Sequence, residues 1–98
     1  MITAFVLVKT AVDVIPEVAQ AIAALDGVTE VYSVAGDVDL IAVVRVRRHE
    51  ELADVIADRL SKVAGILRTD THIAFRAYSS HDLEAAFSLG FPEGDGDS

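Results

Sequence analysis

The chain has 98 residues, of which 52% are hydrophobic and none is cysteine. This length is typical of one domain, which has too little interior to bury so many apolar side chains, so we expect self-association. Sixteen acidic against eight basic residues give a formal charge of −8, which disfavours direct nucleic-acid binding. We find neither a membrane-spanning apolar stretch nor a secretory signal, and therefore expect a cytoplasmic protein that does not bind membranes.

The first half of the chain predicts a strand, a helix and a second strand. Residues 2–9 are rich in β-branched and apolar side chains, as in a short strand. From residue 14 to residue 25 apolar side chains recur at helical spacing, with Pro16 suited to the first turn and Gly27 to the C-terminal stop. Residues 30–35 then predict the second strand.

The second half repeats this order. Residues 39–47 predict a third strand, apolar residues at helical spacing follow up to Gly65, and residues 69–77 predict a fourth strand. The segment Leu25-Asp26-Gly27-Val28 aligns with Val63-Ala64-Gly65-Ile66 at an offset of 38 residues, which indicates a duplicated βαβ unit. We therefore predict an α+β, ferredoxin-like βαββαβ fold, with one antiparallel sheet and two helices on one face.

Alternation along the predicted strands places apolar side chains on both faces of the sheet. In the third strand Ala42 and Val44 point one way, whereas Ile41 and Val43 point the other. An antiparallel sheet with one wet face would instead alternate apolar with polar residues. We expect the second face to pack against another subunit, in a homodimer that assembles further.

The remaining polar clusters predict no catalytic or metal site. His49, His72 and His81 are scattered and lack metal-ligand spacing, and no motif indicates a cofactor. The basic cluster of Arg45, Arg47 and Arg48 is expected to be a strand end that emerges into solvent.

The C-terminal residues predict an extension to a domain that covers residues 1–78. Ser80 resembles a helix cap and Gly90 a helix stop, so residues 79–91 predict a short helix. Residues 92–98 are expected to be disordered.

Four segments together resemble the effector-binding domain of the Lrp/AsnC regulators, the RAM domain, over about residues 3–77. They are Gly27-Val28, Val34-Ala35-Gly36-Asp37-Val38-Asp39-Leu40, Ala64-Gly65-Ile66 and Thr69-Asp70-Thr71-His72-Ile73. The resemblance implies dimers formed through the sheets, higher assemblies of those dimers, and small molecules, typically amino acids, bound between dimers near the central turn. Family members usually carry a helix-turn-helix domain ahead of it, so this chain resembles a stand-alone RAM domain, and full-length relatives are further expected partners.

The resemblance also assigns candidate ligand-binding residues. The Gly-x-x-Asp turn maps onto Gly36 and Asp39, with Val34 at its start, and the Thr-x-Thr of the last strand maps onto Thr69 and Thr71. Backbone N–H groups at the turn suit an amino acid's carboxylate, while the aspartate and the hydroxyls suit its ammonium. Alternatively, the turn is only a hairpin, Asp39 only a solvated strand end, and the threonines only good strand residues.

The sequence therefore predicts an oligomeric module that binds a small molecule, expected to be an amino acid, and is not an enzyme. One alternative is a dimeric α+β barrel enzyme of the cofactor-free monooxygenase or isomerase type. It is disfavoured because the predicted helix-facing residues Ala4, Val6, Ala42 and Val44 are apolar. Another alternative is an assembly module without a ligand.

Overall fold

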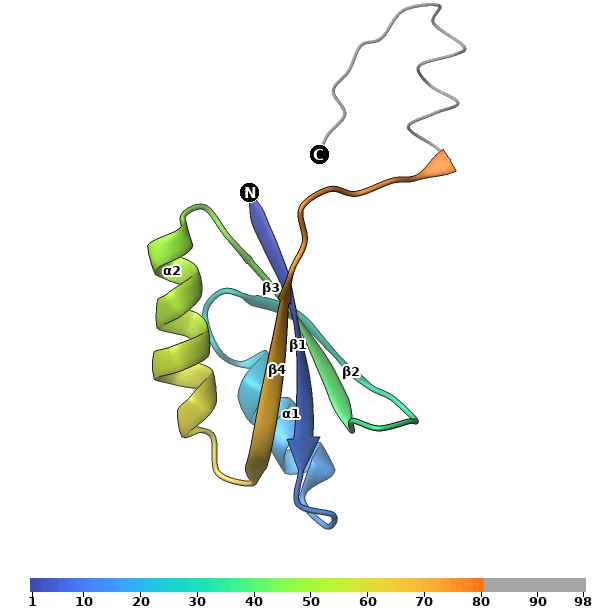
Figure 1. Cartoon of the computed structure of the whole chain (residues 1–98). Coiled ribbons are helices and arrows are strands. Elements are labelled where there is room, and N and C mark those ends of the chain that lie inside the picture. The colour runs from blue at the N-terminus through green and yellow to red at the C-terminus, as the bar shows by residue number, and fades with distance from the viewer. Residues whose placement is uncertain (81–98) are drawn as a thin grey trace, which may run out of the picture.

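The computed structural model of the chain describes residues 1–80, which form one sheet and two helical segments (Figure 1). In chain order its elements are β1 (Ile2–Thr10), α1 (Ile15–Ala23), β2 (Val28–Ser33), β3 (Leu40–Val46), α2 (His49–Ala53), η1 (Asp54–Arg59), η2 (Leu60–Lys62) and β4 (Ile66–Ile73). The segments α2, η1 and η2 follow one another without interruption, with η1 in π-helical and η2 in 3₁₀ form. The predicted order of strands and helices is confirmed.

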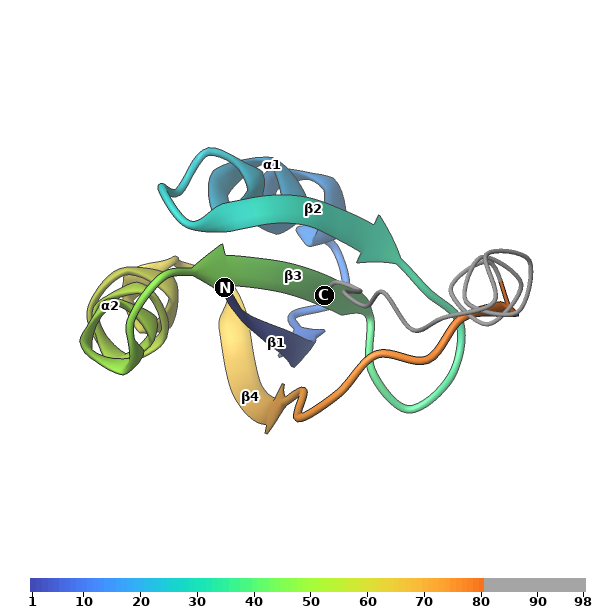
Figure 2. The same ribbon diagram turned by 90° about the horizontal axis from the view of Figure 1, so that it is seen from above.

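The four strands form an antiparallel sheet in the order β2-β3-β1-β4. Figure 2 shows both helical segments on one side of this sheet, while the other side carries no helix. This arrangement is the predicted ferredoxin-like α+β fold.

The core lies between the sheet and the helices. Alternate residues of β1 and β3 face the helices, and the four residues predicted to do so, Ala4, Val6, Ala42 and Val44, are all fully buried. Apolar residues from the helices complete the core: Val18, Ile22, Leu52, Val55 and Leu60. The helix-facing side of the sheet is therefore closed by hydrophobic packing.

Two strands begin earlier than their sequence pattern predicts. β2 covers Val28–Ser33 rather than residues 30–35, and β4 covers Ile66–Ile73 rather than residues 69–77. In both cases the register with the neighbouring strand shifts, between Val28 and Glu30 for β2 and opposite Lys9 and Thr10 for β4. A register shift breaks the strict two-residue alternation on which the predicted bounds depend.

Most of the predicted C-terminal extension lies outside the described residues. Of the helix expected over residues 79–91 only residues 79 and 80 are described, and the tail expected over residues 92–98 is not. This helix and tail stay predictions.

The helix-free face of the sheet is apolar at its centre. Phe5 pairs with Val43, Leu7 pairs with Ile41, and Tyr32 pairs with Ile41, so these five side chains share this face. Phe5 is 39% and Tyr32 52% exposed. The two apolar faces predicted from the strand sequences are therefore present, and only one of them is covered by helices.

Gly27 follows α1 at a point where the chain passes close to the second helical segment. Its φ is +95°, and a Cβ atom there would lie 2.7 Å from Cγ2 of Val55. Gly36 also has a positive φ, +134°, but a Cβ atom at Gly36 would meet nothing within 4 Å. Both glycines therefore adopt a positive φ that other residues rarely adopt, but only at Gly27 is there also no room for a side chain.

We expect Gly27→Ala to destabilise the fold more than Gly36→Ala. Both variants place a side chain at positive φ, which costs about 1–3 kcal/mol. Gly27→Ala adds overpacking against Val55, worth roughly another 1–3 kcal/mol. Urea unfolding of both variants measures the difference, and equal losses would show that the contact with Val55 is unimportant.

Candidate functional site

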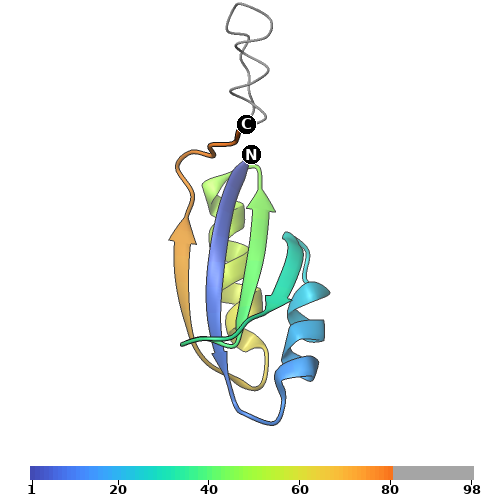
Figure 3. The same ribbon diagram turned by 90° about the vertical axis from the view of Figure 1, so that its right-hand side faces the viewer.

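The candidate site begins in the loop that joins β2 to β3. This connection is six residues long, 34–39, where the sequence predicted a tight hairpin turn at Gly36 and Asp37. Asp39, predicted to open the third strand, is the last residue of the loop. The N–H of Val34 donates to the carbonyl oxygen of Asp39 at 3.0 Å and closes the loop at its base. Figure 3 shows the loop at the opposite end of the sheet from the N-terminus.

Gly36 lies exposed in this loop. Its φ of +134° is one that L side chains rarely adopt, and the space around it is open. Among residues 1–80, no acceptor takes the N–H groups of residues 35–38. The loop therefore presents unpaired backbone donors on the surface, which suits an anionic group.

Asp39 is held against the end of β1 by its carboxylate. The backbone N–H of Thr10 donates to Asp39 Oδ2 at 3.0 Å, and the Thr10 hydroxyl lies 3.5 Å from the same oxygen. Lys9 Nζ lies 3.7 Å from Asp39 Oδ2. The backbone N–H of Asp39 in turn donates to the carbonyl oxygen of Val8. Asp39 is thus fixed to β1 rather than being only a solvated strand end.

The Thr10 backbone hydrogen bond holds the pKa of Asp39 below its ordinary value, and the nearby charge of Lys9 acts in the same direction. Partial burial opposes this shift. At neutral pH the carboxylate is therefore ionised. None of the hydrogen bonds or ion pairs among residues 1–80 uses Oδ1, so one oxygen of this anion can take another donor.

The two threonines lie on β4, on the far side of β1 from Asp39. Thr69 pairs with Val8 and Thr71 with Val6, which places both threonines on the helix-facing side of the edge strand. Thr69 is exposed and Thr71 half-buried. Two inter-strand spacings separate the backbone of Asp39 from that of β4, roughly 10 Å. Thr69 therefore lies level with the start of β3, but the structure does not bring the threonines and Asp39 together around one atom.

Two residues that contact Asp39 were not predicted from the sequence, because they lie outside the Gly-x-x-Asp and Thr-x-Thr segments. Lys9 and Thr10 contact Asp39 across 29 or more positions, because β1 ends where β3 begins in an antiparallel pair. Pairing the predicted first and third strands antiparallel would have placed Thr10 and Asp39 at the same end of the sheet. The specific backbone hydrogen bond could not be inferred in this way.

The histidines lie apart from this region. His49 begins α2, and His72 on β4 lies 3.3 Å from Asp70. His81 falls outside the described residues. Neither His49 nor His72 forms a hydrogen bond or ion pair with Gly36, Asp39 or Thr10.

The sequence of the chain matches a known protein family. A family model described as the Lrp/AsnC ligand binding domain matches residues 3–83. The chain belongs to this family. The resemblance inferred from the four sequence segments is therefore confirmed.

Individual proteins are similar to the chain as well. The structure of TTHA0845 from Thermus thermophilus is 47% identical in sequence and has a TM-score of 0.76. The match covers 81% of this chain and 99% of TTHA0845. The uncharacterized HTH-type transcriptional regulator PH1916 of Pyrococcus horikoshii is 38% identical over 76 residues, which are 74% of this chain and 51% of the regulator. The chain thus spans about half the length of the curated relatives it matches.

Escherichia coli AsnC shares the fold, with a TM-score of 0.72 at 22% identity over 78% of this chain and 52% of AsnC. The family model is that of a ligand-binding domain, and the curated relatives are named as HTH-type transcriptional regulators. Within residues 1–80, no helix is both long and apolar enough to cross a membrane.

We expect Asp39→Asn to flatten the acid dependence of stability. A folded-state pKa below the unfolded value, about 3.9, means that ionised Asp39 stabilises the fold above that value. This contribution is lost as the pH falls through the lower folded pKa. Asparagine keeps an acceptor for the Thr10 N–H but carries no charge.

Urea unfolding of wild type and Asp39→Asn at about pH 7, 4 and 2.5 tests this expectation. The wild type should be the more stable protein at neutral pH, and the gap should close in acid. Glu51, whose pKa is also lowered, is common to both proteins and cancels in the comparison. A gap that stays constant down to the lowest pH would contradict a role for the Asp39 charge.

Proposed function

We propose that this Lrp/AsnC domain is an oligomeric module that binds a free amino acid and has no enzymatic activity of its own. The observation that supports it is that the loop of residues 34–39 carries both kinds of group. It has backbone N–H groups without an acceptor among residues 1–80, and it ends at the ionised, fixed carboxylate of Asp39. An amino acid carries the complementary pair of groups, a carboxylate and an ammonium, on adjacent atoms.

Each half of the ligand has a chemical partner in this loop. The N–H groups around Gly36 receive the ligand carboxylate, as backbone donors at a glycine-containing turn do for many anions. Asp39 Oδ1 accepts the ammonium while Oδ2 stays bonded to Thr10. A charge-assisted bond to a preformed, anchored acceptor is stronger than one to a mobile surface carboxylate.

The threonines of β4 serve a neighbouring copy in this proposal. The strand that carries Thr69 and Thr71 lies roughly 10 Å from Asp39 across β1 in the same chain, and Thr71 lies further along it, too far for one α-amino acid backbone to bridge. Both lie on an edge strand whose outer side pairs with no strand within residues 1–80. In this proposal the loop of another subunit meets this open edge, in a contact separate from the one through the helix-free face.

Assembly of copies follows from the helix-free face of the sheet. Its apolar centre of Phe5, Tyr32 and their strand neighbours is surrounded by charged pairs, the pattern of a protein interface. These ion pairs are Glu30–Arg45, Asp70–His72 and Lys9–Asp39. The occupant we propose for this face is the same face of a second copy, because one isologous contact covers both apolar centres.

A regulator with the same fold supplies a first test compound. NMB0573 from Neisseria meningitidis was solved as a complex with L-methionine, at 15% identity and a TM-score of 0.71 over 80% of this chain and 52% of that one. The likeness at this identity concerns the fold. L-methionine is therefore one member of the screen rather than the assigned ligand.

We expect at least one of the common amino acids to raise the thermal midpoint of the protein. A ligand at 100 times its dissociation constant adds about 2.7 kcal/mol per site, which is several degrees for a domain of this size. Asp39→Asn should weaken that ligand by about tenfold or more through loss of the charged acceptor. Thr71→Val should weaken it without changing strand propensity.

Thr3→Val is the matched control, since Thr3 lies on β1 opposite Arg45, at the other end of the sheet. It should leave the midpoint shift unchanged. No response to any amino acid at millimolar concentration would favour an assembly module without a ligand. A midpoint shift that is unchanged in both Asp39→Asn and Thr71→Val would show that the amino acid binds at another site.

We expect Phe5→Glu to dissociate the assembly. A buried carboxylate at the centre of an apolar interface is costly unless it is paired, so the substitution opposes association of the two faces. Sedimentation at micromolar concentration should give a mass above that of one chain for the wild type and a smaller species for Phe5→Glu. Val12→Glu, at an 87% exposed loop position, is the control and should sediment as the wild type does. A wild type of monomer mass would contradict the proposed interface.

A further inference from the structure

A pocket lies at the other end of the sheet from the loop of residues 34–39. It has a volume of about 320 Å³ and is formed where the end of β3 meets the turn before β2 and the second helical segment. β3 separates the two regions, since Asp39 precedes this strand and Arg47 follows it. The pocket is therefore distinct from the proposed amino-acid site, and the volume is at the small end of the range for small-molecule sites.

Cations are concentrated at this pocket. Three of the chain's eight Lys and Arg residues line it, Arg45, Arg47 and Arg59, although the chain as a whole carries a formal charge of −8. Arg45 is already engaged, because its Nη1 donates to Thr29 Oγ1 at 3.1 Å and lies 3.9 Å from Glu30. Arg47 and Arg59 are left as the pocket's available guanidinium groups.

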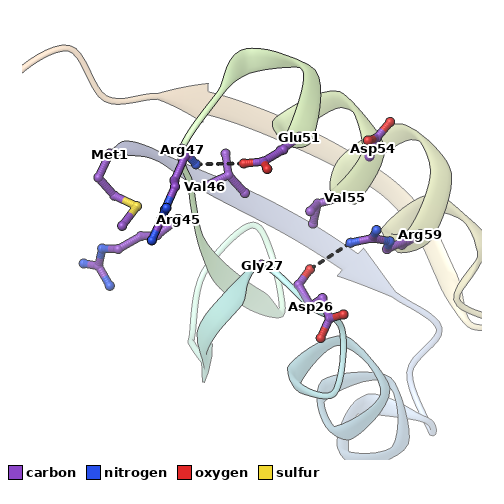
Figure 4. A pocket seen from close by; sticks show the side chains of 10 residues that line it. All are labelled: Met1, Asp26, Gly27, Arg45, Val46, Arg47, Glu51, Asp54, Val55 and Arg59. Carbon is purple, nitrogen blue, oxygen red and sulfur yellow. Dashed lines mark hydrogen bonds between the residues drawn. The ribbon is translucent and has the colours of Figure 1, made fainter.

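These two arginines flank an apolar floor. Figure 4 shows Arg47 and Arg59 on opposite sides of Val46 and Val55. The Arg47 guanidinium makes no hydrogen bond or ion pair with residues 1–80, and Arg59 uses only Nη1, which donates to the carbonyl oxygen of Asp26 at 3.3 Å. Both groups retain donors for a ligand.

Three acidic residues also line the pocket, Asp26, Glu51 and Asp54, but within residues 1–80 none forms an ion pair with Arg47 or Arg59. Glu51 Oε1 accepts the backbone N–H groups of Arg47 and Arg48, and its Oε2 lies 3.8 Å from the Arg48 guanidinium. Glu51 therefore fixes the backbone of Arg47 and leaves the Arg47 side chain free. The carboxylates of Asp26 and Asp54 point away from the gap between Arg47 and Arg59 in Figure 4.

The helical wall of the pocket has an unusual backbone. Val55 and Arg59 both belong to η1, a six-residue π-helix. The Val55 side chain packs against Gly27, where a Cβ atom would lie 2.7 Å from Val55 Cγ2. π-Helical segments are rare and occur often at functional sites. Here the segment places an apolar residue and a cation, one turn apart, against the same turn at Asp26 and Gly27.

We propose that this pocket binds a small dicarboxylate. Its two carboxylates bond to Arg47 and Arg59, and its short apolar spacer lies over Val46 and Val55. Arginine is suited to both contacts, because its planar guanidinium can bond a carboxylate through two parallel N–H groups. A monocarboxylate or a single phosphate satisfies only one of the two cations.

Succinate is the probe, followed by shifts in the backbone amide resonances of the isotopically labelled chain. We expect saturable shifts around residues 26–27, 46–47 and 55–59 on titration to about 20 mM, which is twenty times a millimolar dissociation constant. Butyrate, which replaces one carboxylate by a methyl group, should bind at least about tenfold more weakly. Arg47→Gln and Arg59→Gln should each weaken succinate by a similar factor.

Lys62→Gln is the matched control, since it removes one positive charge from the continuous helical segment of α2, η1 and η2 at a position outside the pocket. It should leave succinate binding unchanged. Arg47→Gln breaks no bond within residues 1–80, so it tests the site even where loss of the Arg59–Asp26 bond disturbs the turn. Absence of succinate shifts at these residues, equal binding of butyrate or inorganic phosphate, or equal loss in Lys62→Gln would each overturn the proposal.

Discussion

Strands β1 and β3 lie side by side at the centre of the sheet, and both carry apolar side chains on both of their faces. The helices can cover only one face, because both βαβ crossovers are right-handed and return on the same side. The inner face becomes the fully buried core, and the outer face keeps Phe5 and Tyr32 at the surface. This one-sided covering explains the high hydrophobic content of a short, acidic chain, and the outer face is the one through which we propose that copies associate.

The end of the same central pair determines the candidate site. Where β1 stops and β3 starts, Asp39 replaces regular strand pairing by a carboxylate that accepts the Thr10 N–H. A residue that supports the fold in this way can still bind a ligand, because only one of its two oxygens is used. The structural and functional interpretations of the Gly36–Asp39 turn are therefore compatible, and under the proposed function the pH response of the fold and the ligand affinity depend on the same ionised group.

The order of elements and the buried faces could be predicted from the sequence, because hydrophobic periodicity reports directly which side chains face the core. Pro16 and Gly27 bracketed α1 for local steric reasons. The bounds of β2 and β4 could not be predicted, since bulges at Val28 and Lys9 depend on the partner strand. The contacts of Thr10 with Asp39 and the π-helix beside Gly27 also arise only from tertiary packing, so neither the anchored carboxylate nor the arginine pocket has a local sequence signal.

Hydrogen–deuterium exchange measured with and without the amino acid that raises the thermal midpoint most tests the central claim most directly. The N–H groups of residues 35–38 have no acceptor within residues 1–80, so in the free protein they should exchange quickly. The account predicts that the ligand slows exchange in the loop of residues 34–39, where its carboxylate is received. Protection confined to the arginine pocket, or absent from this loop, would contradict it.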